Sequence, residues 1–305
     1  MKKMKFEEFT SAVVEKIREY LPESFATASV DLQTVTKNND LKLTGLTIRS
    51  ANSNVSPTIY LEQFFDRYQN GEEMSRVLEN IADIRIRHEV SDVFDVNQIT
   101  DFGRVKGKIV PRLIGKKWNE ELLKDRPYTE IADLAVTYHI LLGEDGDTSA
   151  SAAVSNSLMA SWNTDVEELH RLALNNLPVL LPSTFQSMSD VLGNLFGYTP
   201  ENENADAISY ADDKMFVLSN SHRVNGAAAL LDREIMKSIV DRLGEDFFIL
   251  PSSVSEIIIV KADSYMDTDV LTAMIQEVNA AQVAPEERLS DHPYRYSLEE
   301  GLISI

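Results

Sequence analysis

A run of basic side chains between residues 103 and 118 is the part of the sequence best suited to bind an anion. The run contains no acidic residue, and its cations are Arg104, Lys106, Lys108, Arg112, Lys116 and Lys117. The chain as a whole has a formal charge of −20. Lysine and arginine bind phosphate and carboxylate groups through charge-assisted hydrogen bonds. The segment therefore predicts an anion site, and the alternative is that its cations neutralise carboxylates within the fold.

Three cations of this run, Arg112, Lys116 and Lys117, are the main candidates for that site. Residues 109–114 have the composition of a β-strand, in which alternate side chains point to the same face. Arg112 and Lys116 follow that rule directly, whereas Lys117 joins them only if the strand ends near Gly115. A functional site requires the three side chains to share one accessible face.

A second candidate is the string DHPYRY at residues 291–296, which combines a histidine and an arginine with two tyrosines. His292 and Arg295 are suited to anion binding. The alternative is a turn followed by a strand whose aromatic side chains pack in the ordinary way.

The sequence contains no recognisable motif for catalysis, a cofactor or a metal. The histidines are His88, His139, His170, His222 and His292. No two of them have the spacing of a metal-binding pair. Glycine-rich phosphate loops and a nucleophile elbow are also missing from the sequence. We therefore expect no metal and no cofactor, and the sequence leaves the catalytic residues of any enzymatic activity unknown.

Charge and composition limit the class of protein. An acidic surface repels phosphate backbones, so nucleic acid is an unlikely partner. The chain has no cysteine, and its apolar runs are shorter than the roughly 18 residues that span a membrane. Residues 1–5 are basic and lead into an amphipathic segment rather than the apolar core of a signal peptide. We expect a cytoplasmic protein that does not bind membranes.

The pattern of apolar residues along the chain predicts an α+β fold of two lobes, with mixed or antiparallel sheets and packed helices. The clearest signal is a pair of continuous apolar runs, residues 247–250 and 257–260, joined by a polar loop. Continuous runs indicate strands covered on both faces, so Phe248 and Ile258 should both be buried. Helical periodicity flanks the pair and predicts a β-α-β-β-α-β order for residues 214–305.

The rest of the chain gives weaker but usable patterns. Helices are predicted at residues 6–21, 72–88 and 164–177, the last ended by Pro178 and opened by a capping box at Thr164. Strands are predicted at residues 28–36, 41–49, 109–114 and 134–142, and Pro111 places the third of these at a sheet edge. A change of alternation at Gly45 suggests a bulge.

These patterns predict three segments. Residues 1–178 form an N-terminal lobe, residues 179–213 a connection or acidic insertion, and residues 214–305 a C-terminal lobe.

Six strings, taken together, resemble an uncharacterised family of bacterial cytoplasmic proteins known only as a domain of unknown function. They are LTGLTIR at 43–49, PTIYL at 57–61, DRP at 125–127, NGAAA at 225–229, LPSSV at 250–254 and VNAAQVAP at 278–285. The resemblance spans nearly the whole chain and implies a bacterial intracellular protein. It implies no activity, cofactor or catalytic residue.

Two functions remain open at this stage. The first is a non-enzymatic interaction or regulatory module with an unidentified protein partner, which the lack of paired catalytic groups favours. The alternative is an enzyme or binder of a small anionic or phosphorylated ligand that uses the basic segment 103–118. Cations clustered beside carboxylates in one cleft would favour the second function, and full pairing of the basic strand with acidic neighbours would favour the first.

Overall fold

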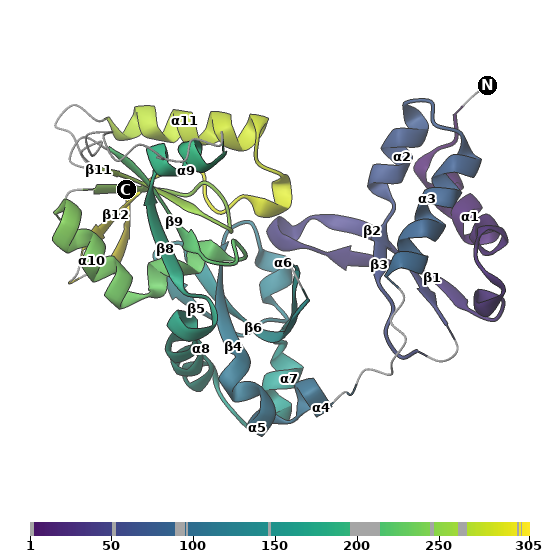
Figure 1. The fold of residues 1–305 in the computed structure, drawn as a ribbon, viewed down its shortest axis with the longest axis horizontal. Helices are drawn as coiled ribbons and strands as arrows, with labels where there is room; N and C mark the ends of the chain where they lie inside the picture. Colours follow the sequence, from purple (N-terminus) through teal and green to yellow (C-terminus); the bar gives the residue numbers. More distant parts are fainter. Residues whose placement is uncertain are drawn as a thin grey trace, which may run out of the picture. The chain divides into compact units, whose positions relative to one another are not determined.

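The fold is α+β, as predicted, and contacts divide the chain into two units (Figure 1). It is described from a computed structural model in which residues 3–50, 53–88, 95, 97–145, 148–195, 214–244, 247–261, 267–297, 299 and 301–305 can be placed. The first unit comprises Met1–Lys37 and Leu41–Val96, and the second comprises Asn38–Asp40 and Asn97–Ile305. No helix in the placed part of the chain is long and apolar enough to cross a membrane.

The first unit is a three-stranded antiparallel sheet in the order β1-β2-β3 with helices packed against it. Its elements are α1 (Phe6–Lys16), η1 (Ile17–Tyr20), η2 (Glu23–Phe25), β1 (Ser29–Thr36), β2 (Lys42–Arg49), β3 (Thr58–Tyr60), α2 (Glu62–Gln69) and α3 (Met74–Arg87). The helical stripe predicted from residue 6 supplies its core, since Phe9, Val13 and Ile17 are fully buried.

Gly45 does not mark the predicted bulge. The pairing of β1 with β2 runs without a register shift from Ser29–Arg49 to Thr36–Lys42. Gly45 is required instead by a close approach, because a Cβ atom there would lie 2.4 Å from the Thr58 side chain on β3. A residue with no side chain lets the two strands pack at this point.

The second unit contains two sheets. The four-stranded sheet has the order β4-β6-β5, with β7 also paired to β6, and the six-stranded sheet has the order β13-β12-β10-β11-β9-β8. The strands are β4 (Ile109–Gly115), β5 (Tyr128–Ile131), β6 (Leu134–Asp145), β7 (Thr148–Ala153), β8 (Ser183–Ser187), β9 (Met215–Asn220), β10 (Phe247–Leu250), β11 (Ile257–Lys261), β12 (Tyr294–Ser297) and β13 (Gly301–Ser304). β4, which contains Pro111, lies at an edge of the four-stranded sheet, as predicted.

The helical elements of this unit lie between and around the strands. They are η3 (Asn38–Asp40), α4 (Asn97–Thr100), α5 (Phe102–Val105), η4 (Lys106–Lys108), α6 (Glu120–Leu123), α7 (Asn156–Ser161), α8 (Val166–Leu180), α9 (Met188–Leu195), η5 (Gly226–Leu231), α10 (Arg233–Leu243), α11 (Thr268–Ala281) and η6 (Pro285–Glu287). The order β9, α10, β10, β11, α11, β12 is the predicted β-α-β-β-α-β order.

Helix α8 differs from its prediction at both ends. Its N-cap is Asp165, whose side chain accepts a hydrogen bond from the backbone N–H of Glu168, rather than Thr164. Its last turn includes Pro178. A proline so near the end of a helix removes one backbone donor, and the following turn still closes through the bond from Leu181 N–H to the Leu177 carbonyl.

The two apolar runs form the antiparallel pair β10–β11, in which Phe248 pairs with Val260 and Ile249 with Ile259. Both faces of the pair are covered, as continuous apolar runs require. One face joins the main core with α10, and the other forms a smaller cluster with α11. Phe248 is buried, but Ile258 is only partly buried, because it lies on the α11 face at the border of the smaller cluster.

The two units do not follow the expected division into residues 1–178, 179–213 and 214–305. The four-stranded sheet and the six-stranded sheet share one hydrophobic core, which includes Leu134 and Tyr138 from the first and Ile249 and Ile259 from the second. Within the expected connection, β8 pairs with β9 and extends the six-stranded sheet. Residues 196–213, the acidic part of that segment, lie outside the described residues.

Candidate functional site

The basic segment leads through β4 into a tight contact between two loops. β4 ends at Gly115, and a Cβ atom there would lie 2.7 Å from the backbone oxygen of Leu289 and 3.2 Å from the Trp118 ring. Glycine therefore permits the chain around residues 115–118 to pack against the chain around residues 289–291. This packing places the end of the basic segment beside the DHPYRY string.

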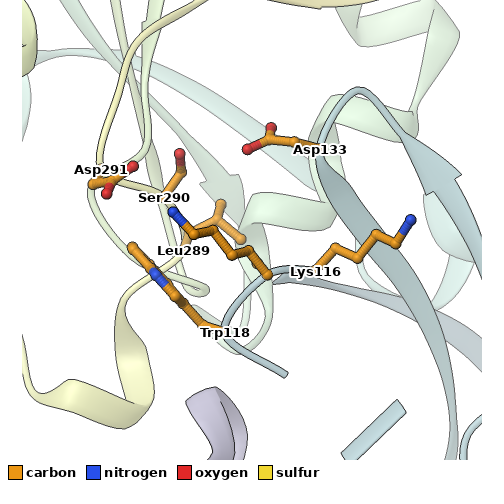
Figure 2. A pocket seen from close by; sticks show the side chains of 8 residues that line it. Lys116, Trp118, Asp133, Leu289, Ser290 and Asp291 are labelled. Atoms are coloured by element: carbon orange, nitrogen blue, oxygen red, sulfur yellow. The ribbon is translucent and has the colours of Figure 1, made fainter. Parts of the chain in front are cut away.

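A shallow hollow open to solvent lies where these loops meet (Figure 2). It is lined by Gly115, Lys116, Lys117, Trp118, Asp133, Leu289, Ser290 and Asp291. Lys116 extends away from Asp291 in this view, and its Nζ lies 2.7 Å from a carboxylate oxygen of Glu130 on β5. This hydrogen bond raises the pKa of Lys116. The hollow thus combines cations and carboxylates in its lining.

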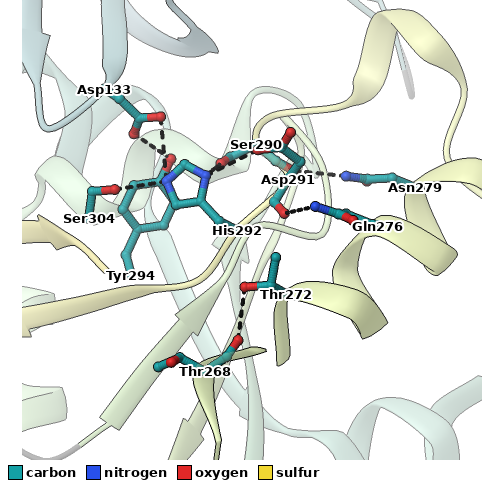
Figure 3. A network of polar contacts seen from close by, with 10 residues as sticks. All are labelled: Asp133, Thr268, Thr272, Gln276, Asn279, Ser290, Asp291, His292, Tyr294 and Ser304. Carbon is teal, nitrogen blue, oxygen red and sulfur yellow. Dashed lines mark hydrogen bonds and ion pairs between the residues drawn. The ribbon is translucent and has the colours of Figure 1, made fainter. Parts of the chain in front are cut away.

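His292 is the centre of a polar network at the edge of the hollow (Figure 3). Its Nε2 lies 2.9 Å from Ser304 Oγ and 3.5 Å from a carboxylate oxygen of Asp133. Its Nδ1 lies 3.1 Å from both the Asp291 carboxylate and Ser290 Oγ. The imidazole is therefore held between two aspartates that come from different parts of the chain.

The aspartates favour the protonated imidazole. The hydrogen bond to Asp133 raises the pKa of His292 against the opposing effect of burial. Burial raises the pKa of Asp133, but hydrogen bonds from His292 and Tyr294 outweigh it and leave this pKa below the usual value. The Tyr294 hydroxyl donates to Asp133 over 2.7 Å. The contact between His292 and Asp133 is thus supported by a tyrosine.

The contacts of His292 with Ser304 and Asp291 resemble those of a hydrolytic triad, in which a serine and an aspartate bind opposite nitrogens of one imidazole. Here the Asp133 carboxylate approaches the same Nε2 as Ser304, so this nitrogen is shared with an acid instead of facing the serine alone. The contacts therefore tie the loop at residues 290–292 to Asp133 and to β13, and we call this network the latch.

The latch connects to helix α11. The Asn279 side-chain amide donates to the Ser290 carbonyl over 2.8 Å, and Gln276 donates to the Asp291 carbonyl over 3.4 Å (Figure 3). Asn279 is buried, so this bond satisfies a polar group that would otherwise be costly to bury. The loop that carries His292 therefore also fixes the last turns of α11.

The apolar surface of helix α11 is wider than its buried face. The buried face packs Leu271 and Ile275 against the six-stranded sheet. Directly beside it Val270, Met274 and Val278 are 65%, 43% and 38% exposed. Residues four apart lie above one another on a helix, so these three side chains form a continuous apolar stripe, which we call the α11 stripe.

The remaining predicted anion-binding residues lie elsewhere. Arg295 is exposed on β12, with its guanidinium 5.9 Å from the centre of the Phe248 ring. Arg112 shares its strand face with Lys116, but the fully covered Ile114 lies between them. The structure thus brings Lys116, Lys117 and His292 around one pair of loops and places Arg112 and Arg295 in other surroundings.

Sequence reasoning missed Asp133, Tyr294 and Ser304 as members of the latch. Asp133 lies in the turn between β5 and β6, and Ser304 lies on β13, which was not predicted. Tyr294 stands two residues from His292 in the DHPYRY string, but no local pattern links Asp133 or Ser304 to His292. Within the described ranges, no group of three His, Asp or Glu side chains is placed to hold a metal ion.

Comparison with known proteins gives one result. A protein-family model matches residues 6–298, which is nearly the whole chain. The chain belongs to DUF5688, a family of unknown function. This confirms the resemblance inferred from the six sequence strings. No curated protein and no solved structure matches the chain, so membership of DUF5688 brings no activity with it.

Proposed function

We propose that this protein is a non-enzymatic interaction module that binds a basic amphipathic helix of a protein partner on the α11 stripe. The observation that carries the proposal is the exposure of Val270, Met274 and Val278 on a single helix face. Isolated exposed aliphatic side chains are ordinary, but a contiguous apolar surface on a soluble protein marks an interaction site. The stripe is the right shape for a helix with apolar residues at the same spacing.

The charge around the stripe supports the choice of partner. Helix α11 contains Asp269 and Glu277 and no lysine or arginine, and Asp267 caps it. A partner helix with basic residues beside its apolar stripe would therefore meet opposite charge along the edge that carries Asp269 and Glu277. A second copy of this chain would instead bring like charges together, which opposes self-association through α11.

The connection between α11 and the His292 latch supports a regulatory version of the same function. Asn279 and Gln276 tie α11 to the loop that contains Ser290 and Asp291. A change in the protonation of His292, or a ligand in the hollow, would act on the loop that holds the helix. Occupation of the α11 stripe is accordingly expected to depend on the state of this loop.

The alternative function, binding of a small anionic ligand through the whole segment 103–118, has less support. Arg104 lies 3.4 Å from Asp101, and Lys116 is bonded to Glu130. Lys116 and Lys117 line one hollow with Asp133 and Asp291, but Arg104 and Arg112 lie in other surroundings, so the segment does not act as one site.

The test uses two labelled model peptides, an amphipathic helix of leucine and lysine and its counterpart of leucine and glutamate. The variant Val270→Ser/Met274→Ser/Val278→Ser removes the α11 stripe and keeps every charge of the helix. Val179→Ser is the matched control, because Val179 is 76% exposed on α8, away from the stripe. Fluorescence anisotropy measures binding, and light scattering measures the oligomeric state.

We expect the lysine peptide to bind the wild type and the Val179→Ser control equally, and the triple variant at least about tenfold more weakly. The glutamate peptide should not bind. Equal affinity of the wild type and the triple variant would mean that only charge attracts the peptide, and the proposal would fail. A dimer that the triple variant dissociates would show that a second copy occupies the stripe.

A further inference from the structure

A cationic surface separate from the hollow lies on the four-stranded sheet, on the face opposite the main core. β4 and β6 are antiparallel, with Val110 paired to His139 and Arg112 paired to Thr137. Residues paired directly across two strands point to the same face, as do alternate residues of one strand. Arg112, Thr137 and His139 therefore share a face, while Tyr138 points into the main core.

Both ends of this face are covered by apolar groups. At one end Val110 is buried in a cluster with Leu177, Leu181 and Ala228. At the other end Ile114 is buried in a cluster with Leu123 and Ala135 from α6 and β6, respectively. Arg112 lies between Val110 and Ile114 on the strand but remains partly exposed, as does His139 beside it. We call the partly exposed polar strip between the two apolar clusters the opening.

A second arginine completes the opening. The pairing of β5 with β6 ends at Tyr128 and Thr137, and beyond it His139 pairs with Ala153 of β7. The backbone N–H of Asn156 donates to the Asp125 carbonyl, so Arg126 lies where β5 and β7 meet along β6, and its side chain is 26% exposed. Burial, and then the charges of Arg112 and Arg126, lower the pKa of His139 to about 3. Three nitrogen-rich side chains from different parts of the sheet therefore converge.

The charges of this opening are poorly compensated. The Arg112 Nε is buried and has no hydrogen-bond partner. Glu287 acts on Arg112 only through its charge, and the carboxylate that pairs with Arg126 is that of its neighbour Asp125, at 3.9 Å. Buried cations are normally paired with acids or hydrogen-bonded in full. The imbalance is notable in a chain with 49 acidic and 29 basic residues.

We propose that Arg112, Arg126 and His139 bind the phosphate group of a small ligand. A phosphate dianion balances two guanidiniums and offers several acceptor oxygens to the guanidinium donors and the imidazole N–H. The buried side chains of Val110 and Ile114 bound the cationic surface at its two ends. The acidic remainder of the surface repels a polyanion such as nucleic acid, which restricts the ligand to a small molecule.

Titration of the intact protein with three probes tests the site. Inorganic phosphate and methyl phosphate distinguish free phosphate from a phosphate ester, and acetate reports on carboxylates. Binding is measured by calorimetry, and the His139 imidazole is followed by NMR, because a bound dianion should raise its pKa. Arg126→Gln removes one guanidinium at a partly exposed position, and Arg126→Lys keeps the charge without the planar donor pair.

Arg171→Gln is the matched control, since Arg171 is an exposed arginine on α8 bonded to Glu168. We expect saturable binding of phosphate or methyl phosphate that shifts the His139 signals. Arg126→Gln should weaken this binding at least about tenfold, Arg126→Lys less, and Arg171→Gln less than about twofold.

Three outcomes would overturn the proposal. They are no saturable binding of either phosphate probe by the wild type, equal weakening by Arg126→Gln and Arg171→Gln, and acetate binding as tight as that of phosphate. Phosphate binding with unchanged His139 signals would place the anion elsewhere and would also contradict the site.

Discussion

Helices α10 and α11 cover opposite faces of the same six-stranded sheet, and they do so in different ways. α10 buries Met236 and Ile239 completely in the main core, and its exposed face is polar, with Lys237 and Asp241. α11 buries Leu271 and Ile275 in a smaller cluster and leaves Val270 65% exposed.

The two helices therefore differ in how much of their apolar surface the fold buries. α10 has the apolar and polar faces that folding alone requires. The apolar face of α11 extends beyond the residues that enter the described core, and hydrogen bonds from Asn279 and Gln276 hold its last turns. We interpret α10 as a structural helix and α11 as a helix that is held in place to bind.

The largest predicted effect is on the α10 face of the sheet. Ile259→Ala should lower the free energy of unfolding by about 2–5 kcal/mol, because Ile259 is fully buried in the main core. Ile258→Ala, on the α11 face, should cost less, since Ile258 is partly buried beside a smaller cluster. Urea denaturation measures both. Equal losses would remove the distinction between the two faces.

The next effect concerns the polar anchor of α11. Asn279→Ala should cost about 1–3 kcal/mol, because the carbonyl of Ser290 loses its buried donor. Chemical denaturation gives the value, and Gln276→Ala, whose side chain is exposed, should cost less. A loss within experimental error for Asn279→Ala would show that packing alone holds the helix.

A smaller effect should depend on pH through the latch. Because the pKa of His292 is raised in the folded protein, its contribution is complete below the unfolded value near 6.5 and is lost as the pH rises through the folded pKa. The lowered pKa of Asp133 gives a contribution that is present above 3.8 and is lost as the pH falls through the folded pKa. The latch should therefore stabilise most between these limits.

His292→Gln tests this dependence. The difference in unfolding free energy between the wild type and the variant should be largest near pH 5 to 6 and should shrink at alkaline pH. Denaturation series at several pH values, with His222→Gln as a control outside the latch, measure it. A difference that does not change with pH would mean that His292 acts by packing and not by charge.

The smallest effect on stability is expected at the α11 stripe. Met274→Ser should change the free energy of unfolding by less than about 0.5 kcal/mol, because Met274 is exposed and outside the core. Thermal denaturation checks this. A loss comparable to that of Asn279→Ala would show that the α11 stripe belongs to the fold, and the contrast with α10 would disappear.

Much of the secondary structure could be predicted because it depends on local patterns. The runs at residues 247–250 and 257–260 are apolar at every position, and they form strands covered on both faces. Pro111 cannot donate a backbone hydrogen bond, and its strand lies at an edge. The division into units could not be predicted, because periodicity identifies strands and helices but not which sheets share a core.

The candidate sites were predicted only in part, for a related reason. Alternation along β4 correctly relates Arg112 to Ile114 and Lys116, but it does not reveal that α6 covers Ile114 and separates the two cations. Nor does it reveal that Arg112 lies on the same face as His139, which the pairing of β4 with β6 brings beside it. Contacts between residues far apart in the sequence leave no local signal.

Composition and patterns within short segments were enough to predict the α+β class, the β-α-β-β-α-β order and the family. They could not predict that His292 lies between Asp133 and Asp291 or that His139 lies on one face with Arg112, which only the fold shows. The fold also decided that α11 keeps an exposed apolar stripe. The physical reason is that burial and charge are set by neighbours, and strand pairing brings these neighbours from distant positions in the chain.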